Sequence, residues 1–293
     1  MAVTAPKFTP GQLNVHSGIN DVVKITRALR GTGRRIALVP TMGALHDGHR
    51  QLMRTARRLP NAVLTASIFV NPLQFGPGED YERYPRPLEA DLDICREERV
   101  ELVVNPGREA MYGPDAHTTV HPGPLGDELE GAARPGHFAG VLTVVAKLFN
   151  IVRPDFAVFG EKDYQQLVLV RRMVRDLDLD VKVIGVPIVR DTDGLARSSR
   201  NAYLDDGQRA AAVALSAALT AGMRISAEGT AAVLDAARGV LDKEPGIDVD
   251  YLELRGRDLE PTPTAGEARL LVAARVGTTR LIDNVPVFLG EPR

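Results

Sequence analysis

Hydrophobic residues follow two spacings along the first two thirds of the chain, and these spacings predict alternating strands and helices. Short runs rich in Val, Ile and Leu are typical of strands buried on both faces, whereas apolar residues repeated every three or four positions predict helices. The predicted strands are 35–39, 62–70, 101–106, 156–160 and 181–189, and the predicted helices are 21–30, 48–59, 88–100, 138–152 and 164–177. This alternation predicts a doubly wound, Rossmann-like α/β domain with a parallel sheet.

The pattern changes near residue 190. Two Ala-rich amphipathic helices come first and three strand-like runs follow without helices between them: 206–225, 230–242, 249–255, 269–276 and 278–287. Strands that are joined directly predict an antiparallel sheet. We therefore predict a Rossmann-like domain over residues 1–189 and a second, smaller α+β C-terminal domain over residues 190–293.

Composition narrows the class of protein. The 293 residues are 44% hydrophobic and 25% charged, as in soluble globular enzymes. A formal charge of -2 argues against a nucleic-acid partner. The single cysteine, Cys95, cannot form an intrachain disulfide, which favours a reducing compartment. No signal peptide and no membrane-spanning apolar run is recognisable, so we expect a cytoplasmic protein without a membrane partner.

The stretch "PTMGALHDGHR" places His46 and His49 where the first predicted strand turns into a helix. A helix start attracts anions, because its N–H groups are unpaired and its dipole is positive there. A zinc site is the first alternative, but zinc needs three or four ligands and no further cluster supplies them. Histidines with a purely structural role are the second. Phosphate contact is favoured, and Gly48 would let a bulky anion approach the backbone.

Three other polar loops follow predicted strands, at the sheet edge where α/β proteins bind ligands. Lys162 is one of six lysines against thirty arginines. Alone it would be read as a surface charge, but its position suits a phosphate. "RSSRN" (197–201) is either a polar turn that caps the next helix or a loop that closes over a triphosphate. Gln74 and Gln166 suit hydroxyl and carboxylate groups of a substrate, although a loop glutamine is more often a surface residue.

Taken together and in this order, six motifs resemble the pantothenate synthetase (pantoate–β-alanine ligase) family. They are "PTMGALHDGH", "FVNPLQF", "YPR", "RPGHFAGV", "FGEKDYQQL" and "SSRN", within a similarity that spans about residues 35 to 290. That family belongs to the nucleotidylyltransferase superfamily, which has a His-x-Gly-His motif. The resemblance implies an ATP-dependent condensation of pantoate with β-alanine through a pantoyl adenylate, with release of pyrophosphate and AMP.

The resemblance also implies roles for individual residues. Pantoate would be held by Gln74 and Gln166, and Gln74 would border β-alanine. ATP would contact Met42, Gly43, Ala44, Leu45, His46, Asp47, Gly48, His49, Gly160, Glu161, Lys162, Asp163, Val189, Arg197, Ser198, Ser199 and Arg200. The catalytic groups, which stabilise charge at the phosphates, would be His46, His49, Lys162, Ser198, Ser199 and Arg200.

The chain departs from the family pattern at three positions. Asp47 stands where the family usually has Glu, and Arg197 stands where it usually has Met, which adds a cation to the nucleotide loop. The family tends to show a pair of acids near Mg²⁺, and in "PLEADLD" only Asp91 aligns with them, so Asp91 is the expected magnesium ligand. We expect a homodimer, because apolar strands leave room for a contact between subunits.

Two other functions remain open at this point. The chain could be a nucleotidylyltransferase that moves AMP or CMP to a phosphorylated acceptor, or a non-catalytic protein that senses a nucleotide. The two glutamine loops and the length of the resemblance favour the ligase, and the reaction products distinguish the three.

Overall fold

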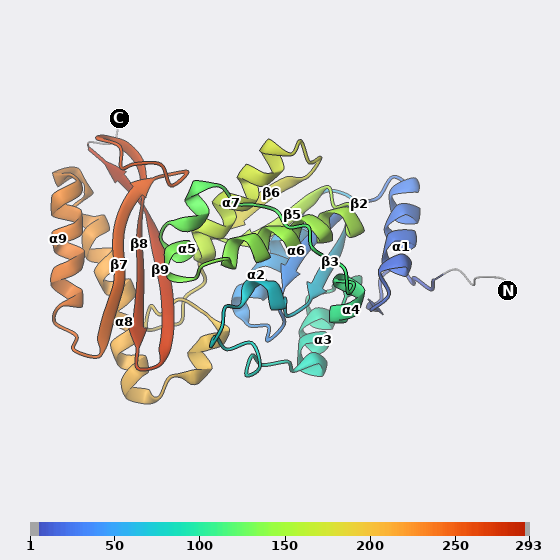
Figure 1. Ribbon diagram of the computed structural model, residues 1–293, viewed down its shortest axis with the longest axis horizontal. Helices are drawn as coiled ribbons and strands as arrows, with labels where there is room; N and C mark the ends of the chain where they lie inside the picture. Colours follow the sequence, from blue (N-terminus) through green and yellow to red (C-terminus); the bar gives the residue numbers. More distant parts are fainter. Residues whose placement is uncertain (1–5, 291–293) are drawn as a thin grey trace. The chain divides into compact units, whose positions relative to one another are not determined.

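The first two thirds of the chain form a six-stranded parallel sheet with the strand order β1-β4-β3-β2-β5-β6. Figure 1 labels β2, β3, β5 and β6 of this sheet. The computed structural model describes residues 6–290. The strands are β1 (Asn14–His16), β2 (Arg35–Thr41), β3 (Ala62–Ile68), β4 (Leu102–Val104), β5 (Phe156–Gly160) and β6 (Lys182–Val186). The predicted doubly wound fold is therefore confirmed. The edge strand β1 was not predicted, because it has only three residues and two of them are polar.

Helices cover both faces of this sheet. They are α1 (Ile19–Gly31), α2 (Asp47–Arg57), α3 (Leu88–Glu97), α4 (Arg108–Met111), α5 (Glu130–Ala133), α6 (His137–Val152) and α7 (Tyr164–Asp176), with short turns η1 (Pro72–Gln74), η2 (Pro124–Asp127) and η3 (Glu161–Asp163). Ala37 and Val39 of β2 pack in one core with α2 and α3, which also buries Cys95. Ile36 and Leu38 are equally buried on the opposite face, where α1 and α6 contact β2.

The sheet has its switch in strand order between β2 and β5, and the two strands separate there. They pair only at Ala37 and Leu38, whereas β2 continues beside β3 as far as Thr41. Pro40 lies on the β5 side beyond the last pair, so its missing N–H removes no hydrogen bond from the ladder. The loops that follow β2 and β5 thus start from strands that are neighbours in the sheet but separate at their ends. Ligand sites in such sheets usually lie at this point.

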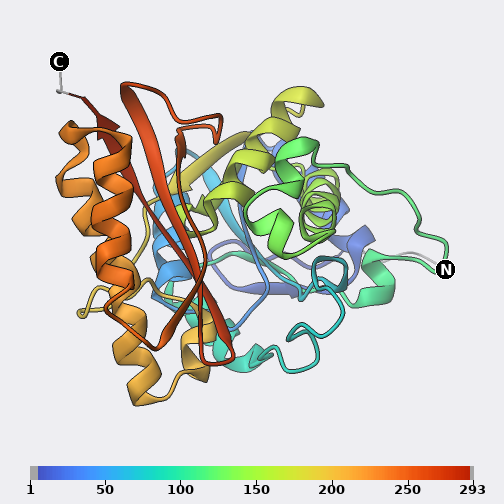
Figure 2. The ribbon, with the colours of Figure 1, turned by 60° about the vertical axis from the view of Figure 1, so that its left-hand side comes forward.

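The C-terminal part forms a second unit around a three-stranded antiparallel sheet. Its elements are η4 (Ser199–Tyr203), α8 (Asp206–Arg224), η5 (Ser226–Glu228), α9 (Thr230–Leu241), β7 (Ile247–Gly256), β8 (Gly266–Val276) and β9 (Thr279–Leu289). Helices α8 and α9 lie side by side along one face of the sheet (Figure 2). A core of Leu, Val and Ala residues from both helices and all three strands joins the layers.

Neither of the two units is a single continuous stretch of the chain. The first contains the described residues up to Glu161 together with Leu169–Val186, and the second contains Lys162–Val168 together with the described residues from Pro187. The division proposed from the sequence, after residue 189, did not anticipate that the start of α7 groups with the C-terminal unit. Across residues 6–290, none of the helices has the length and apolar character needed to cross a lipid bilayer.

Gly140 allows α6 to lie directly against the η1 turn. A Cβ at this position would come within 2.1 Å of the carbonyl oxygen of Leu73 and 2.7 Å of the Gln74 amide nitrogen. Both are backbone atoms, which cannot move aside as a flexible side chain can. The contact between α6 and η1 therefore requires glycine.

We expect Gly140→Ala to lower the free energy of unfolding by about 1–3 kcal/mol, because the added methyl group overpacks the α6–η1 contact. Gly239→Ala in α9 is the control, since a Cβ there meets nothing within 4 Å. It should stabilise the protein by up to about 1 kcal/mol through the loss of chain entropy in the unfolded state. Urea unfolding measures both, and equal effects of the two substitutions would contradict the packing argument.

Candidate active site

The turn between β2 and α2 carries the predicted histidine pair on a left-handed backbone. Gly43 and Ala44 have φ angles of 83° and 49°. The Gly43 amide donates to Thr41 Oγ1 at 3.2 Å. The amides of Ala44 and Leu45 donate to the carboxylate of Asp91 on α3, at 2.9 and 2.7 Å. A side chain from another helix therefore holds the turn.

Asp91 was the expected magnesium ligand, and its surroundings do not fit that role. Only 1% of the residue is exposed, and both carboxylate oxygens accept backbone hydrogen bonds. Burial raises the pKa of this carboxyl more than the bonds from Leu45 and Ala44 lower it. Mg²⁺ keeps several waters and binds accessible carboxylates. Among residues 6–290, no group of three or more His, Cys, Asp and Glu side chains is arranged to hold a metal ion.

His46 and His49 form a reciprocal cap at the start of α2. His46 Nδ1 accepts a hydrogen bond from the Gly48 amide at 3.1 Å, and His49 Nδ1 accepts one from the His46 amide at 3.2 Å. A ring nitrogen that accepts a hydrogen bond carries no proton, so each ring is neutral and protonated on Nε2. The ring centroids are 4.2 Å apart. The cap thus sets two Nε2–H donors together at the positive end of the helix dipole.

Gly48 makes room for this cap. A Cβ at residue 48 would lie 2.7 Å from Cε1 and 2.9 Å from Nδ1 of His46. The sequence suggested that Gly48 would let an anion approach the backbone. In the structure, the nearest constraint on residue 48 is the ring of His46, which folds back over the helix start.

Two arginines of α2 pair with the buried carboxylate of Glu98 and fix the orientation of the helix. Arg54 donates to both oxygens of Glu98 at 3.0 and 2.6 Å, and Arg50 donates to the same carboxylate at 3.3 Å. Glu98 is 4% exposed. Burial by itself raises the pKa of Glu98, but the bonds and charges of Arg54 and Arg50 outweigh it and lower the pKa. The helix that carries the histidines is therefore tied to the end of α3.

Gln74 ends the η1 turn after β3, and its amide is oriented by neighbours. Its side-chain oxygen accepts from Asn71 Nδ2 at 3.1 Å, and its side-chain nitrogen is 3.0 Å from Met42 Sδ. Asn71 also donates to the Gly140 carbonyl at 3.1 Å and accepts from the Tyr112 hydroxyl at 2.8 Å. The amide of Gln74 therefore turns its NH₂ group toward Met42. Two predicted site residues from neighbouring strand ends, Met42 and Gln74, thus lie in contact.

Lys162 and Gln166 lie on the segment that groups with the second unit. The carbonyl of Lys162 accepts from Asn284 Nδ2 at 3.0 Å. The guanidinium of Arg269, which is 6% exposed, lies 4.0 Å from the ring centroid of Tyr164, within cation–π range. These contacts tie the backbone of Lys162 and the side chain of Tyr164 to the antiparallel sheet.

The predicted nucleotide loop is a hairpin followed by a tight turn. The Arg197 amide donates to the Val189 carbonyl at 2.9 Å, so these two predicted site residues are paired. Ser198 caps the start of the η4 turn, and its hydroxyl accepts from the Arg200 amide at 3.3 Å. Ser199 is the first residue of that turn. The "SSRN" residues are therefore ordered within their own segment.

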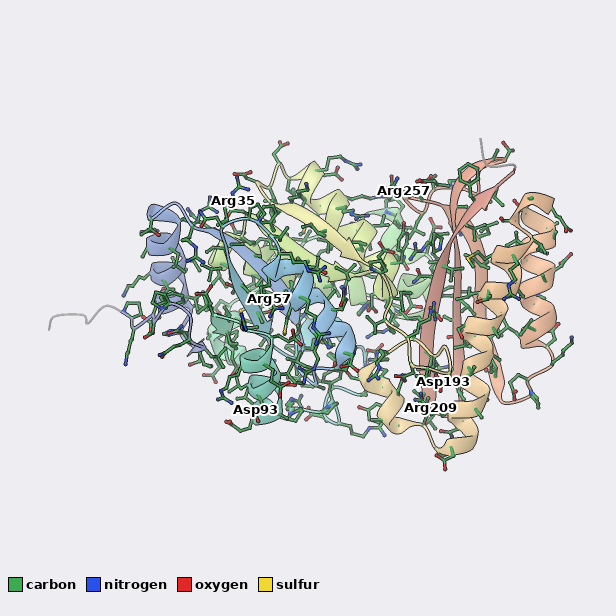
Figure 3. All side chains as sticks on the ribbon, turned by 180° about the vertical axis from the view of Figure 1, so that it is seen from behind. Arg35, Arg57, Asp93, Asp193, Arg209 and Arg257 are labelled. Carbon is green, nitrogen blue, oxygen red and sulfur yellow. The ribbon has the colours of Figure 1, made fainter. Side chains whose placement is uncertain are left out.

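Arg197, which was expected to add a cation for ATP, is paired within the loop. Its Nε lies 2.5 Å from Asp191 Oδ1. Arg209 on α8 lies 2.8 Å from oxygens of Asp191 and Asp193, and Figure 3 shows Arg209 beside Asp193. Arg197 is thus part of a four-residue network of charges, and it is not an uncompensated cation.

The predicted site residues fall in both units. Met42–His49, Gln74, Gly160 and Glu161 belong to the first, and Lys162, Asp163, Gln166, Val189 and Arg197–Arg200 belong to the second.

Sequence reasoning missed four polar residues around Gln74. Asn71 donates to its side-chain oxygen, Tyr112 donates to Asn71, and Arg134 and His137 lie within hydrogen-bond distance of its backbone carbonyl. Asn71 and the pair Arg134 and His137 do occur in the motifs "FVNPLQF" and "RPGHFAGV". No spacing rule assigned them a partner, because they meet only in the folded chain.

Comparison with known proteins gives a consistent result. The family model for pantoate–β-alanine ligase matches residues 14–286. The chain belongs to this family. The chain is 65% identical to the pantothenate synthetase of Saccharopolyspora erythraea over 98% of its own length and 95% of that protein. It is 63% identical to that of Mycolicibacterium smegmatis, over 97% and 91%.

Solved structures support the same assignment to the pantoate–β-alanine ligase family. The pantothenate synthetase of Thermus thermophilus has a TM-score of 0.85 and 47% identity, covering 93% of this chain and 99% of that one. The ligase of Francisella tularensis, solved with β,γ-ATP and β-alanine, has a TM-score of 0.78 and 32% identity, covering 93% and 97%. The family resemblance drawn from the motifs is confirmed.

In this family member, we expect Asp91→Asn to lower the free energy of unfolding by about 2 kcal/mol, because an amide NH₂ would face a backbone N–H that now has a carboxylate partner. Asp93→Asn is the control. Asp93 is on the same helix, exposed and paired only with Arg96 among the contacts described, and Figure 3 shows it at the surface. Its replacement should change stability by less than about 0.5 kcal/mol.

Urea unfolding with and without MgCl₂ separates the two roles of Asp91. A turn-holding carboxylate predicts the same loss of stability in both conditions. Stabilisation of the wild type by Mg²⁺ that disappears in Asp91→Asn would restore Asp91 as a magnesium ligand.

Proposed function

We propose that this chain condenses pantoate with β-alanine to give pantothenate, with ATP converted to AMP and pyrophosphate. The observation that carries the proposal is the cap at the start of α2. It presents the Nε2–H groups of His46 and His49 at the point where the strand order switches. Family membership supplies the substrates.

In the first half of the reaction, a pantoate carboxylate oxygen attacks the α-phosphorus of ATP, and the bond from this phosphorus to the bridging oxygen breaks. Pyrophosphate leaves and pantoyl adenylate remains. No base is needed, because the carboxylate is already ionised. Charge grows on the phosphate oxygens, and positioned donors stabilise it. We assign this role to His46, His49, Lys162, Ser198, Ser199 and Arg200.

In the second half, the neutral amine of β-alanine attacks the acyl carbon, AMP leaves with the electron pair of the broken C–O bond, and the new amide nitrogen releases one proton to water. No residue is an evident base for this step, so the contribution of the protein is to hold the two reactants in place. We assign the grip on pantoate to Gln74 and Gln166. Gln74 directs its side-chain NH₂ toward Met42 at the end of β2, and such an amide can donate to an oxygen of a small hydroxy acid.

The remaining expectations concern Mg²⁺, assembly and compartment. Mg²⁺ would enter with the nucleotide and be bound mainly by phosphate oxygens, since Asp91 does not fit as its ligand. A homodimer is proposed from the apolar strands, and a cytoplasmic location from the single cysteine, which is buried and free.

The first test is an assay of AMP release with ATP, pantoate and β-alanine, in which each substrate is omitted in turn. AMP release that needs all three substrates supports the ligase. A nucleotide retained on the product would indicate a nucleotidylyltransferase, and ATP binding without turnover would indicate a sensor.

We expect His46→Asn and His49→Asn to slow pantoyl adenylate formation by roughly 10²-fold, because each removes one donor to the developing charge. Asparagine keeps an acceptor near the position of Nδ1, so the helix cap and the fold should persist. His121→Asn is a matched control. His121 Nδ1 also accepts a hydrogen bond from the backbone amide two residues later, that of Gly123, at 3.1 Å, but this residue lies on an exposed loop. Single-turnover kinetics at the wild-type rate would exclude the histidines from the reaction.

We expect Gln74→Ala and Gln166→Ala each to weaken pantoate binding roughly 10- to 100-fold, which corresponds to about 1–3 kcal/mol for an unpaired substrate group. ATP affinity should stay nearly unchanged, and exposed Gln12 provides the control substitution, Gln12→Ala. Calorimetry with each ligand separates the cases. Equal losses for both ligands would show that the glutamines support the fold, and unchanged pantoate affinity would place the acid elsewhere.

A further inference from the structure

Gln74 is the last residue of the single turn η1. Backbone carbonyls at the end of a helix have no hydrogen-bond donor within that helix, so the carbonyl of Gln74 needs a partner from elsewhere. Two side chains satisfy it in this structure. His137 Nδ1 lies 2.8 Å from this oxygen, and Arg134 Nη2 lies 3.2 Å from it. Both lone pairs of the carbonyl are therefore engaged by side chains outside η1.

The hydrogen bonds around His137 define its tautomer. Arg134 Nη1 lies 3.1 Å from His137 Nε2. A guanidinium has only donors, so Nε2 must accept and carries no proton. Nδ1 then carries the proton and donates to Gln74. Burial, and next the charge of Arg134, lower the pKa of His137 to about 4, which keeps the ring neutral near pH 7.

Glu79 holds Arg134 in this arrangement. Its two oxygens accept from Arg134 Nε at 2.7 Å and Nη2 at 2.6 Å. Burial raises the pKa of Glu79, but the bonds and charge of Arg134 outweigh this effect and lower it, so the carboxylate is ionised. A bidentate pair of this kind fixes the plane of the guanidinium. The direction of each hydrogen bond is thus set from Glu79 through Arg134 to His137.

We propose that His137, protonated on Nδ1 and held by Arg134 and Glu79, is a positioning residue that sets Gln74 in its pantoate-binding pose. The proposal rests on the proposed role of Gln74. The side chain of Gln74 is oriented by Asn71 from within η1, and its backbone is fixed by His137 from the first residue of α6. A turn of three residues has too few internal bonds to hold this pose alone.

The test compares two substitutions of His137. One keeps a hydrogen-bond donor near Nδ1, and the other keeps an acceptor near Nε2. Asparagine in His137→Asn places an amide N–H near Nδ1 and can still donate to the Gln74 carbonyl. Glutamine in His137→Gln reaches toward Nε2 and can still accept from Arg134, but it leaves the carbonyl without this donor. We expect His137→Gln to weaken pantoate binding roughly tenfold and His137→Asn less than about threefold, with ATP affinity unchanged in both.

Calorimetry with pantoate and with ATP gives these affinities, and Gln74→Ala is measured beside them as a reference. Equal pantoate affinities in the two His137 variants, or a parallel loss of ATP affinity, would overturn the positioning role. If Gln74→Ala itself leaves pantoate binding unchanged, the proposed function of Gln74 fails instead.

Nitrogen-15 NMR of the histidine rings in the unsubstituted protein provides a readout that does not depend on folding of a variant. His137→Asn identifies the signal. We expect the His137 ring to show a protonated Nδ1 and an unprotonated Nε2 throughout pH 6–8. A ring that is protonated on Nε2, or on both nitrogens, would contradict the proposal.

Discussion

The positions of His46 and His49 depend on the carboxyl group of Asp91, because it holds the turn from which α2 starts. Ala44 has a positive φ, which costs a non-glycine residue roughly 1–2 kcal/mol. The hydrogen bonds from Ala44 and Leu45 to the Asp91 carboxyl group, at about 1 kcal/mol each, are of the size needed to offset this cost. Because Asp91 is buried, its carboxyl group loses contact with water and is hydrogen-bonded by the amides of Ala44 and Leu45 instead. The helix start, the reciprocal cap and the tautomers of His46 and His49 all follow from a turn held in this conformation.

Long elements could be predicted from the sequence because apolar spacing alone defines them. Residues 156–160 were predicted as a strand and form β5, and the predicted helix 138–152 differs from α6 by one residue. The predicted strand 35–39 continues in the structure to Thr41, since Pro40 falls where no donor toward β5 is needed. The fold class and the family were both confirmed. The roles assigned to individual residues as ligand contacts stay predictions.

Contacts between distant segments could not be read from any local pattern. Asp91 was read as a metal ligand because nothing in "PLEADLD" indicates two backbone amides from the β2–α2 turn. Arg197 was read as an added cation, and its partner Asp191 lies across a short hairpin that was not predicted. His137 occurs in the motif "RPGHFAGV" but was assigned no role, because its hydrogen-bond partners, Gln74 and Arg134, are known only from the folded structure. The same limit applies to the start of α7, whose grouping with the C-terminal unit depends on contacts with Asn284 and Arg269.

The buried thiol of Cys95 gives this chain a built-in chemical reporter. Cys95 is its only cysteine, it lies one helical turn after Asp91 on α3, and burial raises its pKa to about 12. A thiol reagent needs both access and the thiolate, so the intact core protects Cys95 doubly. Alkylation must therefore wait for α3 to lift away from α2 and the sheet. The alkylation rate then reports how often α3, the helix that holds the β2–α2 turn, opens, and no probe has to be introduced into the protein.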